Sequence, residues 1–364
     1  IEQAGSVATG LPPGVELMDP AALLDFDAPH DPNNRLGNRW LCRGGSCLWV
    51  GPSGIGKSSL TLQAAITWAH GQPFLGIRPS RPLKSLIIQA ENDLGDIAEI
   101  LQGVTMHLCS KATSDDEAAA WGAAIKLNIV LVRATTHTGA NFARLLSALV
   151  AEHSPDMVWI DPLLSFAGID LSDQRDTSHF LRELMAPIAH RTGVILHFAH
   201  HTPKPPKEKG GRSGWKDSDF SYAAFGSSEL TNFFRAINVL APLGDGQFEL
   251  RLAKRGRRAG AKDPMGNFAD KLHIAHADEG IAWIQITEPD PDDDEPDPTP
   301  RCRSGPTGER SATSEQILQI MGESPWRVTD LQKTVQDRTG CSRITFYRRW
   351  NWLKTAHEVK SSVH

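Results

Sequence analysis

Short apolar runs alternate with longer helical patterns through the middle of the chain. The apolar runs predict strands at Cys47–Val50, Ser85–Gln89, Leu127–Val132, Met157–Ile160 and Val194–Ala199. Apolar residues at helical spacing predict helices over Lys57–His70, Asn141–His153 and Thr177–Arg191. Strands that alternate with helices indicate a parallel sheet that is covered on both faces. The pattern therefore predicts an α/β fold.

The later apolar runs follow one another without helices between them. They lie at Ala236–Leu240, Phe248–Ala253 and Ile281–Ile286. Consecutive strands without intervening helices pair most simply as antiparallel neighbours. We therefore expect an antiparallel extension of the same sheet.

Composition divides the chain into four parts. Residues 1–40 are rich in Pro, Gly and Asp, which predicts an irregular lead-in with one short helix near Pro20–Asp25. The α/β core is expected over residues 41–287. Residues 288–311 combine Pro, Asp, Ser, Gly and Arg and cannot bury enough apolar surface to fold, so they predict a linker. Residues 312–364 return to a helical pattern and predict a small second domain.

The overall composition is that of a globular protein, with 40% hydrophobic and 22% charged residues. No stretch approaches the roughly 18–20 apolar residues of a membrane span. The opening residues lack the basic and apolar regions of a signal peptide. The five scattered cysteines do not show metal-ligand spacing and predict reduced thiols. We expect a cytoplasmic protein without a membrane partner.

The net charge of −5 conceals an uneven distribution of charge. The segment Glu288–Asp297 alone contains seven acidic residues. From Arg301 to His364 the chain carries 11 Lys/Arg and 6 Asp/Glu, a net charge of +5. A basic C-terminal part is compatible with binding to nucleic acid.

A phosphate-binding loop is the strongest local signal in the sequence. It matches G-x-x-x-x-G-K-[ST] between a predicted strand and a predicted helix, the context that the motif requires. Backbone N–H groups and the helix N-terminus attract phosphate oxygens, Lys57 reaches the β- and γ-phosphates, and Ser58 is a ligand for Mg²⁺. We therefore expect ATP and Mg²⁺ as cofactors. The predicted contacts are Gly51, Pro52, Ser53, Gly54, Ile55, Gly56, Lys57, Ser58 and Ser59.

Two carboxylates follow predicted strands. Asp161 ends the run Met157–Ile160, at the sheet edge where ligands bind in open α/β folds, and is the predicted second Mg²⁺ ligand. Pro162 comes next, so the usual neighbouring base is missing. Glu91 follows the run Ser85–Gln89 and is the predicted general base for the attacking water. The alternatives are a turn-capping role for Asp161 and a solvated turn for Glu91.

On these motifs the sequence resembles the RecA-like hexameric replicative helicases of plasmids and phages, the RepA type in particular. The resemblance rests on GPSGIGKSS (51–59), QAEND (89–93), VWIDP (158–162), HFAHHTPK (197–204), 225–240 and LRLAKRGRRAG (250–260). It implies a RecA-like P-loop core over residues 41–287 that hydrolyses ATP. It also implies a homo-oligomeric ring, expected to be a hexamer, with single-stranded DNA as the partner.

The resemblance further implies residues that sense and stabilise the γ-phosphate. His200 and His201 occupy the sensor position at the end of a strand, and His200 is preferred. Arg235 matches the arginine finger, the side chain that one subunit supplies to the active site of its neighbour.

A basic pair near the end of the core also corresponds to residues that face the neighbour's nucleotide. Lys254 and Arg255 match this pair. Arg257 is an alternative, because related helicases read Lys-x-Arg where this sequence reads Lys-Arg-Gly-Arg.

Two loops are expected to line the central channel of the ring. One follows Asp161, around Gly168–Asp176, and the other is Pro203–Tyr222. The second combines phosphate-pairing cations with an aromatic platform, which suits single-stranded DNA bound without sequence preference. An ordinary basic loop is the alternative. The predicted DNA contacts are Lys204, Lys207, Lys209, Arg212, Trp215 and Lys216.

The C-terminal part resembles a helix-turn-helix or winged-helix-like unit. A helix is expected to start within Trp326–Leu331, with Thr329 as its N-cap, and Gly340–Ser342 to form a turn. Ser342–Lys354 would be a recognition helix for duplex DNA. The alternative is a docking module for a protein such as a primase or an initiator. The candidate base contacts are Arg343, Thr345, Arg348 and Arg349.

These features together predict an ATP-dependent ring helicase that translocates on single-stranded DNA and unwinds duplexes during replication of a plasmid, phage or mobile element. The alternative is a RecA-like regulatory or recombination ATPase that binds DNA without unwinding it. A small-molecule P-loop kinase is a third possibility, which the basic C-terminal part, the trans-acting Arg candidates and the missing lid pattern disfavour.

Overall fold

The computed structural model describes residues 15, 17–202, 228–244, 246–277, 281–287, 314–321 and 328–339. The chain divides into two compact units, residues 1–293 and 294–364. The boundary falls inside the segment 288–311, which the sequence predicts as a linker and which lies outside the described residues. Within the described ranges, no helix combines the length and apolar character needed to cross a membrane.

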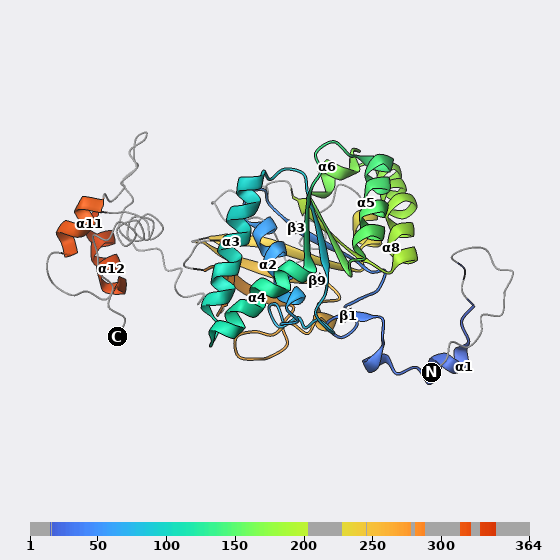
Figure 1. Cartoon of the computed structure of the whole chain (residues 1–364), viewed down its shortest axis with the longest axis horizontal. Coiled ribbons are helices and arrows are strands. Elements are labelled where there is room, and N and C mark those ends of the chain that lie inside the picture. Colours follow the sequence, from blue (N-terminus) through green and yellow to red (C-terminus); the bar gives the residue numbers. More distant parts are fainter. Residues whose placement is uncertain are drawn as a thin grey trace, which may run out of the picture. The chain divides into compact units, whose positions relative to one another are not determined.

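A nine-stranded sheet forms the centre of the first unit (Figure 1). The strands lie in the order β11-β10-β9-β8-β3-β7-β6-β4-β5. Neighbours from β8 to β5 pair in parallel, and β8 to β11 pair antiparallel. The strands are β3 (Ser46–Gly51), β4 (Ser85–Gln89), β5 (Ile129–Arg133), β6 (Met157–Asp161), β7 (Ile195–His201), β8 (Ala236–Gly244), β9 (Gln247–Lys254), β10 (Lys271–His276) and β11 (Trp283–Ile286).

This strand order is that of a RecA-like P-loop core. The phosphate-loop strand β3 lies between β7 and β8, and one strand, β7, separates it from β6, which carries Asp161. The predicted α/β class, the mainly parallel sheet and its antiparallel extension are confirmed.

Helices cover both faces of the sheet (Figure 1). One face packs against α2, α3 and α4, and the other against α5, α6, the π-helical turn η2, α8 and α9. The helices are α2 (Lys57–Ala69), α3 (Leu94–Ser110), α4 (Asp115–Asn128), α5 (Gly139–His153), α6 (Leu163–Ala167), α7 (Gln174–Ser178), η2 (His179–Met185), α8 (Ala186–Thr192), α9 (Ser228–Phe233) and α10 (Gly256–Ala259).

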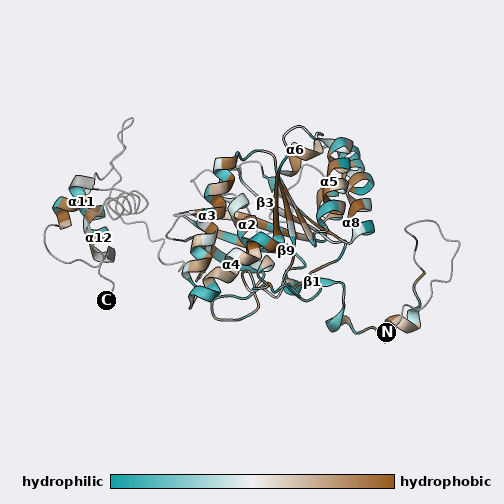
Figure 2. Ribbon diagram, viewed as in Figure 1, coloured by the Kyte–Doolittle hydropathy of each residue, from teal (hydrophilic) through white to brown (hydrophobic). Residues whose placement is uncertain are grey.

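Side chains alternate between the two faces of each strand, so the core has two layers, one on each face of the sheet. On β3, Cys47 and Trp49 join the cluster beneath α2, whereas Leu48 and Val50 join the cluster beneath α5. All four side chains are buried, which is why the strand reads as an uninterrupted apolar run. The strands form the apolar centre of this unit (Figure 2).

Several elements differ from the sequence prediction. Helices α3 and α4 and strand β10 were not predicted, and the helix expected over Thr177–Arg191 is divided among α7, η2 and α8. The short helix expected near Pro20–Asp25 is α1 (Pro20–Leu24), capped by the Asp19 carboxylate.

The core also begins earlier than residue 41. A small sheet of β1 (Asn34–Leu36) and β2 (Leu41–Cys42) leads into β3, and η1 (Ala28–His30) precedes it. Leu36 and Trp40 are fully buried in the cluster beneath α2. The end of the expected lead-in is therefore part of the packed core.

The second unit contains two described helices, α11 (Ser314–Met321) and α12 (Val328–Thr339). Ile317 on α11 and Leu331 on α12 are fully buried. Thr329 lies inside α12, so its prediction as the N-cap was wrong. The helix predicted over Ser342–Lys354, with Arg343, Thr345, Arg348 and Arg349, lies outside the described residues.

Candidate nucleotide-binding site

The phosphate loop connects β3 to α2 at the C-terminal edge of the parallel strands. Gly56, the residue before α2, has a φ of 86°. A Cβ atom there would lie 2.8 Å from Cζ2 of Trp283 and 2.9 Å from Cε1 of His276. Only glycine fits both the dihedral angle and the space. The first N–H groups of an α-helix have no partners within the helix, so the start of α2 suits the phosphate binding that the sequence predicts here.

Lys57 is held inside this loop. Its Nζ donates to the carbonyl oxygens of Gly51 at 2.8 Å and Pro52 at 2.6 Å and lies 2.9 Å from Nδ1 of His201. The residue is only 5% exposed. Burial lowers the pKa of Lys57 to about 8, while the nearby carboxylates of Asp161 and Glu91 act in the opposite direction.

Ser58 and Asp161 meet beside the loop. The Ser58 hydroxyl donates to Oδ2 of Asp161 at 2.6 Å, and Nε2 of Gln89 donates to the same oxygen at 3.1 Å. A hydroxyl and a carboxylate are the hard oxygen ligands that Mg²⁺ takes beside substrate phosphates. The donor set therefore fits Mg²⁺, and Ser58 and Asp161 are the residues that would hold it.

Glu91 lies on the same edge, two residues beyond the end of β4. Its side chain is 59% exposed. Oε2 lies 3.8 Å from Nε2 of His201, and Oε1 accepts a hydrogen bond from the Ser165 hydroxyl at 3.3 Å. An accessible carboxylate this close to the phosphate loop can accept a proton from water.

His201, and not His200, lies beside the phosphate loop. Its ring touches Lys57 on one side and Glu91 on the other. His200 is buried, with its side chain on the opposite face of β7. The sequence-based preference for His200 therefore needs correction to His201. Burial and the Lys57 charge lower the pKa of His201, so the ring is neutral at neutral pH.

Other residues at the site were not predicted. Gln89 bonds Asp161 and accepts from Nδ2 of Asn92 at 3.0 Å, so it orients the magnesium-side carboxylate. A polar residue closing an apolar strand was the available signal for Gln89. Ser165 lies on α6, directly after the Asp161 strand, and no sequence pattern marked it.

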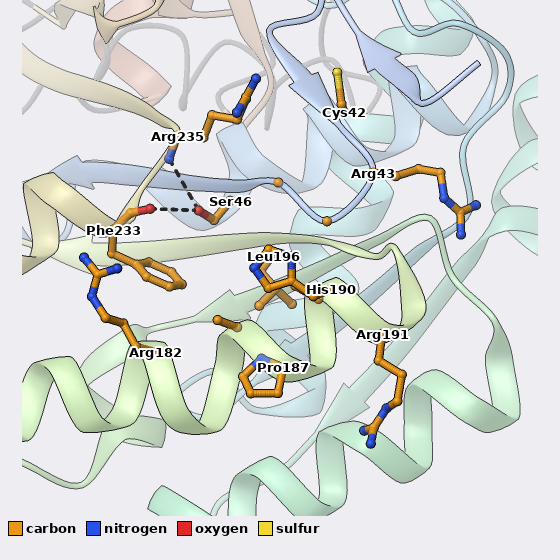
Figure 3. A pocket seen from close by; sticks show the side chains of 14 residues that line it. Cys42, Arg43, Ser46, Arg182, Pro187, His190, Arg191, Leu196, Phe233 and Arg235 are labelled. Carbon is orange, nitrogen blue, oxygen red and sulfur yellow. Dashed lines mark hydrogen bonds between the residues drawn. The ribbon is translucent and has the colours of Figure 1, made fainter. Parts of the chain in front are cut away.

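Arg235 lies at the opposite edge of the sheet, at the start of β8. Its backbone N–H donates to the Ser46 carbonyl oxygen at 3.1 Å. The residue lines a cavity of about 1150 Å³ together with Arg43 and Arg191 (Figure 3). Among the described residues its guanidinium has no hydrogen-bonded or ion-paired partner. The fold therefore keeps Arg235 away from the phosphate loop of its own chain.

The basic pair at the end of β9 lies on this same edge. Nζ of Lys254 donates to the carbonyl oxygens of Thr231 at 2.8 Å and Phe234 at 2.6 Å, which ties β9 to the end of α9. Nη2 of Arg255 donates to the Arg39 carbonyl oxygen at 2.5 Å. Burial lowers the pKa of both groups. Arg257, on α10, is exposed.

The second predicted channel loop, Pro203–Tyr222, lies outside the described residues. This applies to Lys204, Lys207, Lys209, Arg212, Trp215 and Lys216. The described strand β7 ends at His201, at the nucleotide edge. The first predicted loop, Gly168–Asp176, follows α6 at the same edge, and its last residues, Gln174–Asp176, form the start of α7.

The chain matches a known protein family. The AAA domain family matches residues 12–207, more than half of the chain. The chain belongs to the AAA domain family. Among solved structures, a KaiC-like protein of the hyperthermophilic archaeon Pyrococcus horikoshii OT3 matches with 14% identity and a TM-score of 0.41, over 67% of this chain and 91% of that chain. No curated protein matches the sequence.

An AAA domain with an intact phosphate loop is a nucleotide-binding ATPase module. The matched range includes the loop, Glu91, Asp161 and His201. The chain is therefore a RecA-like P-loop ATPase of the AAA domain family.

We expect ATP binding to take up a proton above about pH 8. Free Lys57 has a pKa of about 8, so it loses its proton as the pH rises above that value. Bound phosphates favour the charged ammonium and raise the pKa again. Below pH 8 the free protein already carries the proton, so no uptake follows there. The affinity for ATP should therefore fall as the pH rises from 8 to 10.

Titration calorimetry at pH 9 in two buffers of different ionisation enthalpy measures this uptake directly. The same pair of buffers at pH 7 is the control and should give equal heats apart from ionisation of ATP itself. Equal heats at pH 9 would contradict the low pKa of Lys57.

Proposed function

We propose that the chain is a subunit of a ring-forming DNA helicase that couples ATP hydrolysis to translocation on single-stranded DNA and to duplex unwinding. One observation carries this proposal. The phosphate loop and the candidate arginine finger lie on opposite edges of one sheet, so one chain does not assemble both parts of the site.

The nucleotide edge presents exposed acidic side chains. They follow β4 and β6, which end beside the phosphate loop. These acids give negative charge to the edge that is expected to bind the nucleotide with Mg²⁺. The exposed acids are Glu91, Asp93, Asp96, Asp170, Asp173 and Asp176.

The opposite edge presents exposed arginines. They precede β3, β7 and β8 or follow the antiparallel strand β9. Opposite charges on opposite edges favour head-to-tail association of identical chains, which closes into a ring when the rotation between subunits permits it. The exposed arginines are Arg43, Arg191, Arg235, Arg257 and Arg258. A hexamer is the assembly that we propose, by likeness to RecA-like helicases.

In this proposal each residue of the site has a separate role. Lys57 and the N–H groups of the loop bind the phosphates, and Ser58 and Asp161 hold Mg²⁺, which neutralises phosphate charge when bound. Glu91 accepts a proton from the attacking water. His201, between Lys57 and Glu91, is placed to respond to the γ-phosphate. Arg235 of the neighbouring subunit stabilises the charge that develops on the transferred phosphoryl group.

The general base Glu91 contacts the element that precedes the segment expected to bind DNA. Ser165, which bonds Glu91, belongs to α6, and the predicted channel loop Gly168–Asp176 follows immediately. In this proposal, DNA bound to that loop changes the orientation of the Glu91 carboxylate through α6 and Ser165. This supports coupling between DNA binding and hydrolysis.

Strand displacement on a fluorescent forked duplex tests the proposal. The full chain with ATP and Mg²⁺ should release the labelled strand, and single-stranded DNA should stimulate its ATPase. Lys57→Ala is the matched control and should do neither while remaining folded. Stimulation by DNA without strand release would favour the regulatory or recombination ATPase. Absence of both effects would overturn a DNA-directed function.

A further inference from the structure

The hairpin of β10 and β11 is fastened to the phosphate-loop helix. Nε2 of Gln63 donates to the Trp283 carbonyl oxygen at 2.9 Å, and the Trp283 N–H donates to Oε1 of Gln63 at 2.7 Å. The indole Nε1 of Trp283 donates to the Ser59 hydroxyl at 2.9 Å. Trp283 is 1% exposed, so the start of β11 packs tightly against the phosphate loop.

His276 is the last residue of β10, next to Trp283. It pairs with Trp283 across the β10–β11 ladder, and the two ring centroids are 3.9 Å apart. The imidazole also lies against Gly56, since a Cβ atom there would be 2.9 Å from Cε1 of His276. The His276 ring is half-buried. Burial lowers the pKa of His276, so the imidazole is a neutral aromatic surface at neutral pH.

The direction of a bound nucleotide follows from the strand order. Asp161 and His201 end β6 and β7, and Glu91 follows β4; these three strands lie on one side of β3. This is the side of the γ-phosphate and of the reaction. The strands β8 to β11 lie on the other side of β3.

The α-phosphate, ribose and base of the nucleotide must therefore extend from the phosphate loop toward strands β8 to β11. Lys57 and Ser58 serve the β- and γ-phosphates and Mg²⁺. The next N–H along α2 is that of Ser59, whose hydroxyl already contacts Trp283. An α-phosphate at Ser59 directs the ribose and base toward the hairpin, where His276 is the half-buried ring.

We propose that His276 is a nucleobase platform, on which the purine ring of the bound nucleoside triphosphate stacks with Trp283 as its rigid backing. This inference rests on the nucleotide-binding half of the proposed function and is independent of DNA unwinding. A platform on the chain's own β10 sets the affinity for the base, whereas the phosphate loop sets the affinity for the phosphates.

The test compares ATP with inorganic tripolyphosphate, which lacks the base. With Mg²⁺ present, calorimetry should show that His276→Ala raises the Kd for ATP by roughly 5- to 100-fold, the range expected for loss of one base–aromatic stack. The Kd for tripolyphosphate should stay unchanged. His276→Phe keeps an aromatic surface and should restore most of the ATP affinity.

Three results would overturn the proposal. Unchanged ATP affinity in His276→Ala would place the base elsewhere. Equal losses for ATP and tripolyphosphate would show that His276 only supports the phosphate loop. Failure of His276→Phe to restore affinity, in a variant with unchanged tripolyphosphate binding, would exclude stacking. A wild-type chain that binds neither compound would instead refute the nucleotide site itself, whereas ATP binding without strand displacement would refute only the helicase.

Discussion

Replacing Arg235 by alanine is expected to lower ATP turnover by on the order of 10³–10⁵-fold, the contribution of arginine fingers in characterised GTPases. The chain should remain folded, because the Arg235 side chain is exposed and has no hydrogen-bonded or ion-paired partner within the described ranges. The loss should appear in kcat, since the guanidinium acts on charge that develops in the transition state.

Mixing variants distinguishes an arginine that acts in trans from one that acts within its own chain. Arg235→Ala chains retain Lys57, and Lys57→Ala chains retain Arg235. A mixed ring contains some interfaces with both residues intact, so partial activity should return. Each variant alone should stay inactive at every concentration. ATPase measurements across mixing ratios provide the readout.

Arg191→Ala is the matched control, because Arg191 is an exposed arginine lining the same cavity as Arg235 (Figure 3). Measured at chain concentrations at which the ring is assembled, it should leave turnover close to the wild-type value, because Arg191 adds charge to the association edge and is not the proposed finger. Full activity of the wild-type chain at concentrations where it is monomeric would contradict a trans finger. Wild-type turnover by Arg235→Ala, with loss in Arg255→Ala or Arg257→Ala, would keep the ring and reassign the finger.

Glu91→Gln should bind ATP but hydrolyse it about 10²–10⁴-fold more slowly, the usual contribution of a general base. The amide keeps the size of the side chain and can still accept from Ser165, but it cannot take a proton from water. The lower rate should appear in single-turnover measurements, while the Kd for ATP stays within a few-fold of the wild-type value.

Glu99→Gln is the control for a change of charge near this edge, because Glu99 is an exposed acid on α3, the helix that follows Glu91. Its turnover should be unchanged. Wild-type turnover by Glu91→Gln would show that another group activates the water. A large loss of ATP affinity in the same variant would show that Glu91 supports binding.

Much of the fold could be predicted because its signals are local. The central parallel strands β3, β4, β6 and β7 are buried on both faces, so they read as apolar runs, and β4 matches its predicted bounds. The missed elements lack such a signal. Helix α4 buries only Trp121, so it shows little apolar periodicity, and β10 contains His273 and His276 among its apolar residues.

Local sequence signals could not decide whether His200 or His201 faces the phosphate loop. Both residues close the same strand, and a strand places neighbours on opposite faces. Which face meets the phosphate loop depends on how β7 packs between β3 and β6. The same limit applies to Lys254, whose bonds to carbonyl oxygens at the end of α9 come from a different segment of the chain.

The sequence by itself determined the phosphate loop, Asp161 and Glu91, because their chemistry needs only a strand, a tight turn and the carboxyl end of a neighbouring strand. Tertiary structure alone decided the partners of these residues. Ser59 meets Trp283 across 224 positions of the chain, and Arg235 lies at the edge opposite Lys57. Such contacts depend on the order of strands in the sheet, which follows from the burial of whole layers and not from any short stretch of sequence.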